Sequence, residues 1–309
     1  MTLPYTGSGP YCYANSLAMV LGEHAPPTGV IECLTGSPFG FELLAGTLPF
    51  FDPYGWDPEL GLDAAIGSLG WTCERTDGGS PEEAMARLRK ACADGPVLTG
   101  PLEMGLLTHQ PGMNAAIGAD HYVVVLAVEA GTVLFHDPHG HPYATLPTDA
   151  FAASWRGDEV TYVSTPYVMR SGFVRLREVA ADDALRRTLP AAVRWLAGRD
   201  DLPVPAGTLG GAAGLEALAG LVDAGLDPGM RTMLQVFSIR VGARRLSDAA
   251  ACLSMLGLPD AAALAATQAR IVGGLQHPAV VADDRALAVG LRRLVPTYDR
   301  LRELLTAAR

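Results

Sequence analysis

The chain has 309 residues, of which 49% are hydrophobic and 18% are charged, a composition typical of globular proteins with a substantial core. Its net charge of -10 argues against a nucleic-acid partner, because phosphate binding needs clustered cations. No apolar run reaches the ~18 residues that span a bilayer, and the first residues lack the regions of a secretory signal, so we expect a cytoplasmic protein with no membrane partner.

The first part of the chain begins with helical patterns. Residues 12–21 have apolar side chains at helical spacing and end at Gly22. A second helix is predicted over 58–69. A third is predicted over 81–93, after the capping sequence that starts at Ser80.

Strand patterns follow. Residues 122–128 form an apolar, β-branched run typical of a buried strand. The turn at Ala130 and Gly131 predicts an antiparallel hairpin with 132–135. Further strands are predicted over 97–100, 159–164 and 167–174. Helices followed by a small antiparallel sheet indicate an α+β fold.

The pattern of residue types and the charge both change near residue 175. Residues 1–175 contain 7 Lys and Arg against 19 Asp and Glu, whereas residues 176–309 contain 16 against 14. Helices are predicted over 182–198, 208–224, 229–256, 260–275 and 283–308. We therefore predict a catalytic domain over 1–175 and an all-α domain over 176–309.

Cys12 stands at the start of the first predicted helix, after a Gly-rich turn. Free backbone N–H groups and the helix dipole favour a thiolate there, and the same N–H groups can bind an oxyanion. The alternative is a small buried core residue. An odd count of five cysteines without a CxxC pair favours neither a disulfide framework nor a zinc site.

His121 and Asp137 are the candidate partners of this thiol. His121 comes directly before the buried strand, and Asp137 follows the partner strand. A hairpin that turns at Ala130 and Gly131 brings both residues to one open end, where a carboxylate can orient the imidazole of a nucleophile's base. The alternative for Asp137 is a cap of the Asp-Pro turn.

The segment GADHYVVVLAVEAGTVLFHDPHGHPYATLPTDAFAASW resembles the His and Asp region of the bacteriocin-processing, double-glycine leader peptidases. Those enzymes have a papain-like fold and a Cys at the start of the first helix, as in PYCYANSLAMVL here. With its additional C-terminal sequence the chain looks more like the family of butirosin biosynthesis protein H. The resemblance covers roughly residues 5–175.

That resemblance implies a cysteine-nucleophile acyltransferase that moves an acyl group from a carrier-protein thioester to a small amine, without a cofactor. A cysteine peptidase or amidase is the first alternative, and a non-catalytic binding module of the same fold is the second. The sequence departs from the family at Thr6, where a Gln usually completes the oxyanion hole. Thr6, Ser8 or the backbone of Cys12 are the candidate replacements.

Several other residues are candidates for a substrate pocket, although core packing or a surface position also explains them. They are Tyr5, Tyr11, Tyr13, Asn15, Glu103 and His109. Glu103 is a candidate for reading a substrate amine. His136, His139 and His141 crowd around Asp137, but the intervening Pro and Gly residues indicate a turn and no metal site.

Overall fold

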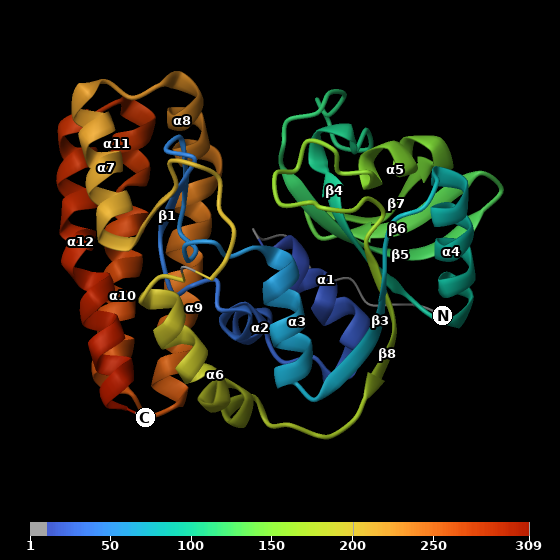
Figure 1. Ribbon diagram of the computed structural model, residues 1–309, viewed down its shortest axis with the longest axis horizontal. Coiled ribbons are helices and arrows are strands. Elements are labelled where there is room, and N and C mark those ends of the chain that lie inside the picture. Colours follow the sequence, from blue (N-terminus) through green and yellow to red (C-terminus); the bar gives the residue numbers. More distant parts are fainter. Residues whose placement is uncertain (1–10, 200, 309) are drawn as a thin grey trace. The chain divides into compact units, whose positions relative to one another are not determined.

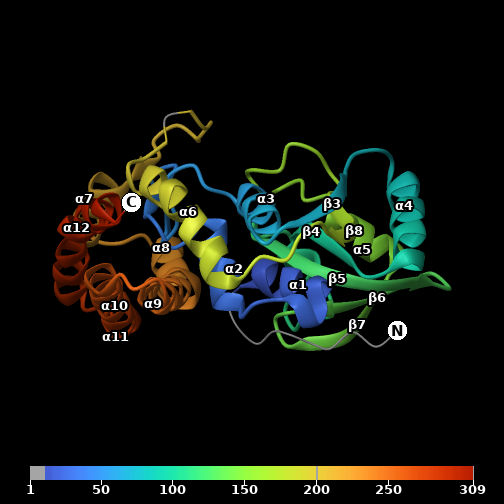
Figure 2. The ribbon, with the colours of Figure 1, turned by 90° about the horizontal axis from the view of Figure 1, so that it is seen from below.

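The computed structural model describes residues 11–199 and 201–308, and Figures 1 and 2 show its ribbon in two views. The chain is an α+β protein with antiparallel sheets and a helical C-terminal region. It divides into two units. The sheet unit comprises the chain up to Thr28 together with Gly70–Glu178, and the helical unit comprises Gly29–Leu69 and the chain from Val179 onward.

The sheet unit is built on a six-stranded antiparallel sheet of order β3-β8-β4-β5-β6-β7. Its strands are β3 (Trp71–Thr76), β4 (Val97–Glu103), β5 (Asp120–Glu129), β6 (Thr132–Asp137), β7 (His141–Pro147) and β8 (Met169–Arg175). Its helices are α1 (Cys12–Leu21), η1 (Gly22–His24), α4 (Pro81–Asp94), η2 (Met104–Leu106) and α5 (Thr148–Trp155).

The central strand β5 is buried on both faces because its side chains alternate between two packing layers. Val123 and Val125 lie in the apolar cluster that also contains residues of α4 and α5. Tyr122, which precedes them in the strand, packs edge-on against Tyr13 of α1, and its carbonyl accepts a hydrogen bond from Ser16 of α1 at 3.2 Å. Helix α1 is thus fixed on the strand that carries the candidate histidine (Figure 2).

The helical unit has nine α-helices among the residues that the structure describes. They are α2 (Thr28–Thr35), α3 (Pro58–Ser68), α6 (Ala181–Leu196), α7 (Gly211–Ala224), α8 (Pro228–Met233), α9 (Ile239–Met255), α10 (Pro259–Gly274), α11 (Gln276–Val281) and α12 (Asp284–Ala307), with the π-helical turn η3 (Leu234–Ser238) joining α8 to α9. A small antiparallel sheet of order β2-β1-β9 accompanies them. Its strands are β1 (Glu42–Leu44), β2 (Leu48–Phe50) and β9 (Leu209–Gly210).

Two features differ from the predicted division at residue 175. The change of unit after Glu178 lies close to it, but residues 29–69, assigned by sequence to the first domain, belong to the helical unit. The C-terminal region is also not all helical, because β9 pairs with β1. The physical reason is long-range pairing. Within residues 29–69, strand β1 pairs with β9, and Glu32 pairs with Arg245 of the later helix α9.

Most predicted elements of both units are present within a few residues, including the capping box of Ser80 and Glu83 on α4. The predicted strand over 159–164 is wrong. Backbone N–H groups of Val160 and Val163 instead bond to carbonyls three residues earlier, which makes successive turns. Among the described residues, no helix combines the length and apolar character needed to cross a membrane.

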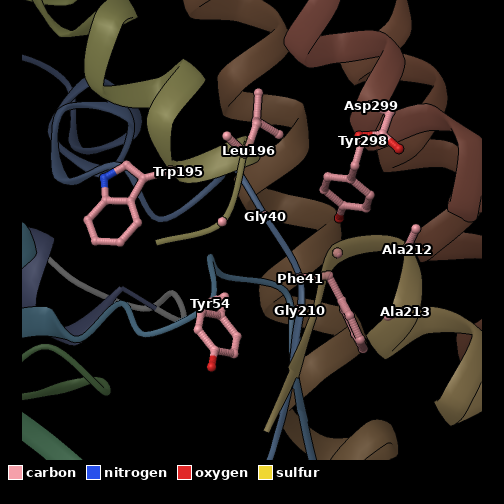
Figure 3. A pocket seen from close by; sticks show the side chains of 13 residues that line it. Gly40, Phe41, Tyr54, Trp195, Leu196, Gly210, Ala212, Ala213, Tyr298 and Asp299 are labelled. Atoms are coloured by element: carbon pink, nitrogen blue, oxygen red, sulfur yellow. The ribbon is translucent and has the colours of Figure 1, made fainter. Parts of the chain in front are cut away.

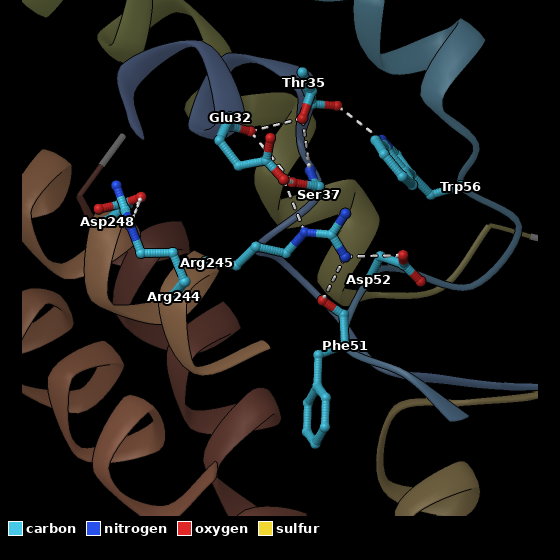
Figure 4. A network of polar contacts seen from close by, with 9 residues as sticks. All are labelled: Glu32, Thr35, Ser37, Phe51, Asp52, Trp56, Arg244, Arg245 and Asp248. Atoms are coloured by element: carbon cyan, nitrogen blue, oxygen red, sulfur yellow. Dashed lines mark hydrogen bonds and ion pairs between the residues drawn. The ribbon is translucent and has the colours of Figure 1, made fainter. Parts of the chain in front are cut away.

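A buried ionic network centred on Arg245 of α9 holds residues 29–69 against the later helices (Figure 4). Its Nε donates to Glu32 Oε1 of α2 at 2.8 Å, and Nη1 donates to Asp52 Oδ2 at 3.0 Å. Ser37 Oγ donates to the same Glu32 oxygen at 2.7 Å, and the guanidinium lies over the ring of Trp56. Because these charges are removed from water, each depends on the others for compensation.

Arg245→Met should therefore lower the free energy of unfolding by about 3–5 kcal/mol, since it leaves two buried carboxylates uncompensated. Arg244→Met is the matched control on the same helix: the Arg244 side chain is 50% exposed and pairs with Asp248, so about 0–1 kcal/mol is expected. Urea unfolding followed by circular dichroism measures both. Equal losses in the two variants would contradict the role assigned to Arg245.

Candidate active site

Cys12 is the first residue of α1, as predicted from the sequence. Tyr11 at the N-cap supplies no side-chain cap, so the first turn of the helix directs backbone N–H groups and the positive end of its dipole toward this position. Cys12 as a whole residue is partly exposed, although its thiol is buried enough for its pKa to be raised, and all five cysteines are free. This placement suits a nucleophile that must meet a carbonyl group.

The β5–β6 hairpin brings His121 and Asp137 together. Ala130 and Gly131 both have positive φ and form the tight turn that the sequence predicted. His121 is the second residue of β5 and Asp137 is the last of β6, so both lie at the end of the hairpin away from the turn. His121 Nε2 donates to Asp137 Oδ1 at 2.7 Å, with the two residues 1% and 0% exposed.

His121 and Cys12 influence each other's ionisation: His121 lowers the pKa of Cys12, and Cys12 raises the pKa of His121. Because Nε2 of the His121 ring is bonded to Asp137, Nδ1 is the ring nitrogen left to face another partner. The backbone of Tyr122 also lowers the pKa of Cys12. Cys12 thus lies within interaction range of the histidine whose ring is bonded to Asp137.

The pKa shifts follow from burial and from these bonds. Burial alone would lower the pKa of His121, but the effects of Asp137 and Cys12 outweigh burial and raise the pKa to about 10. Burial would raise the pKa of Asp137, yet bonds from His109 and His121 hold it below the ordinary range.

Burial raises the pKa of Cys12, and His121 opposes that rise. The raised pKa of His121 favours an imidazolium beside a thiolate, whereas the raised pKa of Cys12 favours a neutral thiol. In this coupled pair the imidazolium is the firmer assignment, because a buried carboxylate touches the ring directly at 2.7 Å.

Asp137 has three further donors besides His121. His109 Nε2 and Gln110 Nε2 both lie 2.7 Å from Oδ2, and the backbone N–H of His139 lies 2.7 Å from Oδ1. His109 was a candidate for the substrate pocket, but in the structure its side chain is hydrogen-bonded to Asp137 instead. Gln110 was missed as a site residue. Its position next to His109 in HQPG is the only signal that the sequence carried.

Glu103, the candidate for reading a substrate amine, is 1% exposed and serves another purpose. Its Oε1 accepts from the backbone N–H groups of Gly105 at 3.0 Å and Ile117 at 2.9 Å, and its Oε2 accepts from Gly118 at 3.0 Å. Glu103 thus joins both ends of the loop that carries His109. The candidate role is corrected because its charge is already satisfied by backbone amides.

The remaining pocket candidates lie at α1. Tyr11, Tyr13 and Asn15 are 2%, 4% and 4% exposed, so they face the interior and not solvent. Tyr5 and the oxyanion candidates Thr6 and Ser8 lie outside the described residues. Of the proposed oxyanion donors, the backbone N–H of Cys12 is the one whose position at a helix start the structure describes.

The histidines around Asp137 pack as rings and backbone anchors. His136 Nδ1 accepts from the Tyr143 N–H at 3.0 Å, the His139 ring lies 5.1 Å from that of His121, and the His141 ring lies 5.3 Å from that of His109. Within 11–199 and 201–308, no group of three or more His, Cys, Asp or Glu side chains is arranged to hold a metal ion.

A second carboxylate lies near the sulfur. Asp120, directly before His121, is close enough for its charge to raise the pKa of Cys12. Its Oδ2 accepts from the Tyr162 hydroxyl at 2.9 Å, and that hydroxyl is 3.3 Å from the hydroxyl of Tyr122. Sequence reasoning did not single out Asp120, because its bond to Tyr162 joins residues 42 apart in the chain.

The fold and this site define an α+β protein in which a cysteine at a helix start meets a buried His–Asp pair. Comparison with known proteins finds that residues 205–306 match the family model described as the YobF C-terminal domain. The chain is 34% identical over 164 residues to the uncharacterized protein YobF of Bacillus subtilis strain 168. That alignment covers 52% of this chain and 52% of YobF, so the chain spans about half the length of the curated relative it matches.

Asp137→Asn should lower the pKa of His121 well below its value of about 10, because the bond and charge of Asp137 no longer oppose burial. NMR titration of the His121 ring measures this. Asp149→Asn, the same change at an exposed carboxylate, should leave the titration unchanged.

The raised pKa of His121 also makes the free energy of unfolding depend on pH. A raised folded-state pKa means that the stabilisation is fully present below pH 6.5 and is lost as pH rises toward 10. The stability advantage of the wild type over Asp137→Asn should shrink across that window. A His121 pKa that does not move in Asp137→Asn would contradict this account.

Proposed function

We propose that this protein is a cysteine-nucleophile enzyme of papain-like type that transfers an acyl group from a thioester to an amine through an acyl-Cys12 intermediate. The observation that carries the proposal is the hydrogen bond of His121 to Asp137 at 2.7 Å, together with the proximity of Cys12, which helps to raise the pKa of His121. A nucleophile, its base and an orienting carboxylate in contact are the arrangement that covalent acyl transfer requires.

In the first half-reaction, the Cys12 thiolate attacks the carbonyl carbon of the thioester and forms a C–S bond. The backbone N–H of Cys12 at the start of α1 supports the oxyanion. As the tetrahedral intermediate collapses, the donor's C–S bond breaks and the leaving thiolate takes the proton held by the His121 imidazolium. The product is an acyl-enzyme with a neutral imidazole.

In the second half-reaction, the amine attacks the acyl carbon and gives its proton to His121. The bond to Cys12 breaks, and the sulfur returns to a thiolate beside the imidazolium. Asp137 keeps its charge throughout, because its four donors stabilise the carboxylate. The second carboxylate near the sulfur, Asp120, favours an amine as the acceptor, since it attracts the ammonium form; the ammonium loses one proton to solvent before the free amine attacks, and His121 takes the second.

A thioester is favoured over a peptide bond as the donor because Thr6 stands where a Gln usually completes the oxyanion hole, and an activated carbonyl needs less stabilisation of its oxyanion. The donor would be carried by an acyl-carrier protein and the acceptor would be a small amine. The free cysteines suit a cytoplasmic setting, where thiols stay reduced. No cofactor is part of the proposed steps.

Incubation with an acyl thioester of N-acetylcysteamine should add the acyl mass to Cys12, read by intact-protein and peptide mass spectrometry. His121→Ala should slow adduct formation by ~10²–10⁴-fold, because the imidazolium that stabilises the Cys12 thiolate and protonates the leaving thiolate is lost. Cys12→Ala should abolish the adduct. Cys73→Ser, at another partly exposed cysteine, should retain it.

Adding an amine to the acyl-enzyme distinguishes acyl transfer from hydrolysis. Added amine should discharge the acyl-enzyme to an amide faster than water releases the acid, and Asp120→Asn should slow discharge by amine while leaving acylation intact. Release of the free acid alone would favour a hydrolase. Absence of any adduct on Cys12 across short and long acyl donors would favour a binding module and refute the proposal.

A further inference from the structure

Two free cysteines of the helical unit, Cys33 of α2 and Cys252 of α9, take no part in the proposed acyl transfer. They lie far apart in the chain, and both are buried. A pair of neighbouring thiols can undergo a reaction that a single thiol cannot, because the second sulfur can attack an oxidised first one and form a disulfide. The position of the two side chains relative to each other is therefore the question.

How α2 lies against α9 is shown by a contact at each end of their shared face. Arg245 of α9 donates to Glu32 of α2 at 2.8 Å (Figure 4). Two turns further along α9, Cys252 Sγ donates to the carbonyl oxygen of Gly29 at 3.8 Å. Because the contact moves forward along α9 while it moves backward along α2, the two helices run antiparallel.

The helices approach each other closely at this point, because Gly29 has no side chain. A Cβ atom at Gly29 would lie 2.7 Å from Cγ of Asp248, which is one turn before Cys252 on the same face of α9. Cys33 is one turn after Gly29 on the same face of α2.

The directions of the two side chains follow from helix geometry, since a Cβ atom leans toward the N-terminus of its own helix. Cys33 therefore leans toward Gly29, whose carbonyl oxygen Cys252 contacts. Cys252 leans toward Asp248, the residue of α9 against which Gly29 packs. The two sulfurs are thus directed toward the same place between the helices.

The two thiols also influence each other's ionisation. Cys33 lowers the pKa of Cys252 against the opposing effects of burial and of the Asp248 charge. Cys252, together with burial, raises the pKa of Cys33 well above its ordinary value. Cys252 is therefore the thiol of the pair that forms a thiolate more readily, and the thiolate is the form that reacts with an oxidant.

The surroundings of the pair restrict the size of the oxidant that can reach it. Gly29 is partly exposed, so Cys252 lies directly beneath the surface at the first turn of α2. The cavity of about 350 Å³ in the same unit is lined by residues such as Tyr54 and Trp195 and includes no cysteine (Figure 3). A hydroperoxide, whose smallest member is close to water in size, fits this approach better than a bulky disulfide.

We propose that Cys252 and Cys33 are a peroxide-reactive dithiol that closes to a disulfide between α9 and α2. The Cys252 thiolate attacks one oxygen of the peroxide, the O–O bond breaks, and the leaving oxygen takes a proton from solvent to give water or an alcohol. The sulfur of Cys33 then attacks the Cys252 sulfenic acid: an S–S bond forms, the S–O bond breaks, and hydroxide leaves with the Cys33 proton as water. The two sulfurs together lose two electrons, and the peroxide gains them.

The bridge joins residues 29–69 to α9 beside the ion pair of Glu32 and Arg245. A cross-link between positions far apart in the chain restricts the unfolded ensemble, so the oxidised protein is the more stable form. This chemistry is independent of the proposed acyl transfer.

Peptide mass spectrometry of the full chain after treatment with hydrogen peroxide under native conditions tests the proposal. The Cys12→Ala background removes the proposed nucleophile, so failure of the acyl transfer does not affect the result. Digestion without reductant should give a peptide pair linked through Cys33 and Cys252, and dithiothreitol should restore both thiols. The thermal midpoint of the oxidised protein should exceed that of the reduced protein by about 5 °C or more.

Single variants in this background separate the two roles. In Cys33→Ala, Cys252 should accumulate as a sulfenic acid that dimedone labels, whereas in Cys252→Ala the thiol of Cys33 should stay reduced. Neither variant should show the rise in thermal midpoint. Cys73→Ala, at a partly exposed cysteine of the sheet unit, is the control and should form the bridge. Circular dichroism before oxidation checks that each variant is folded.

Three outcomes would overturn the proposal. The first is a bridge that forms only in urea, and the second is oxidation of Cys73 or Cys92 without any link between Cys33 and Cys252. The third is a bridged protein whose thermal midpoint is unchanged or lower, because the helices would then not stand at bridging distance in the reduced fold.

Discussion

The carboxylate of Asp137 is the constraint on which the candidate site depends. It is fully buried and accepts hydrogen bonds from the side chains of His121, His109 and Gln110 and from the backbone of His139. Such a charge is tolerated only when its lone pairs are satisfied, so the four donors are held in place as firmly as the acceptor. The orientation of the His121 ring toward Cys12 follows from this requirement.

The same requirement explains how distant segments are ordered. Glu103 pins both ends of the loop that carries His109 and Gln110, and a side chain at Gly105 would place its Cβ 2.1 Å from the carbonyl oxygen of Ala115. In the helical unit, the buried Arg245 holds residues 29–69 in place through its bonds to Glu32 and Asp52. In both units a buried charge joins pieces of chain that have no local reason to meet.

The site was predictable from sequence where a local pattern was sufficient. A cysteine at a helix start, a histidine before a buried strand and an aspartate after its hairpin partner required only periodicity and one turn. Gln110 and Asp120 were not predictable, because their partners are distant in the chain: Asp137 lies 27 residues from Gln110, and Tyr162 lies 42 residues from Asp120. The placement of residues 29–69 was also beyond local reasoning, since Glu32 and Arg245 are 213 residues apart in the chain.

The central claim is that His121, held by Asp137, stabilises the thiolate of Cys12. The most direct measurement is the pH profile of Cys12-specific alkylation by iodoacetamide, followed by peptide mass spectrometry, in the wild type and in His121→Gln. The account predicts a lower apparent pKa for Cys12 in the wild type, because the imidazolium favours the thiolate against the opposing effect of burial. The same apparent pKa in both proteins would contradict it.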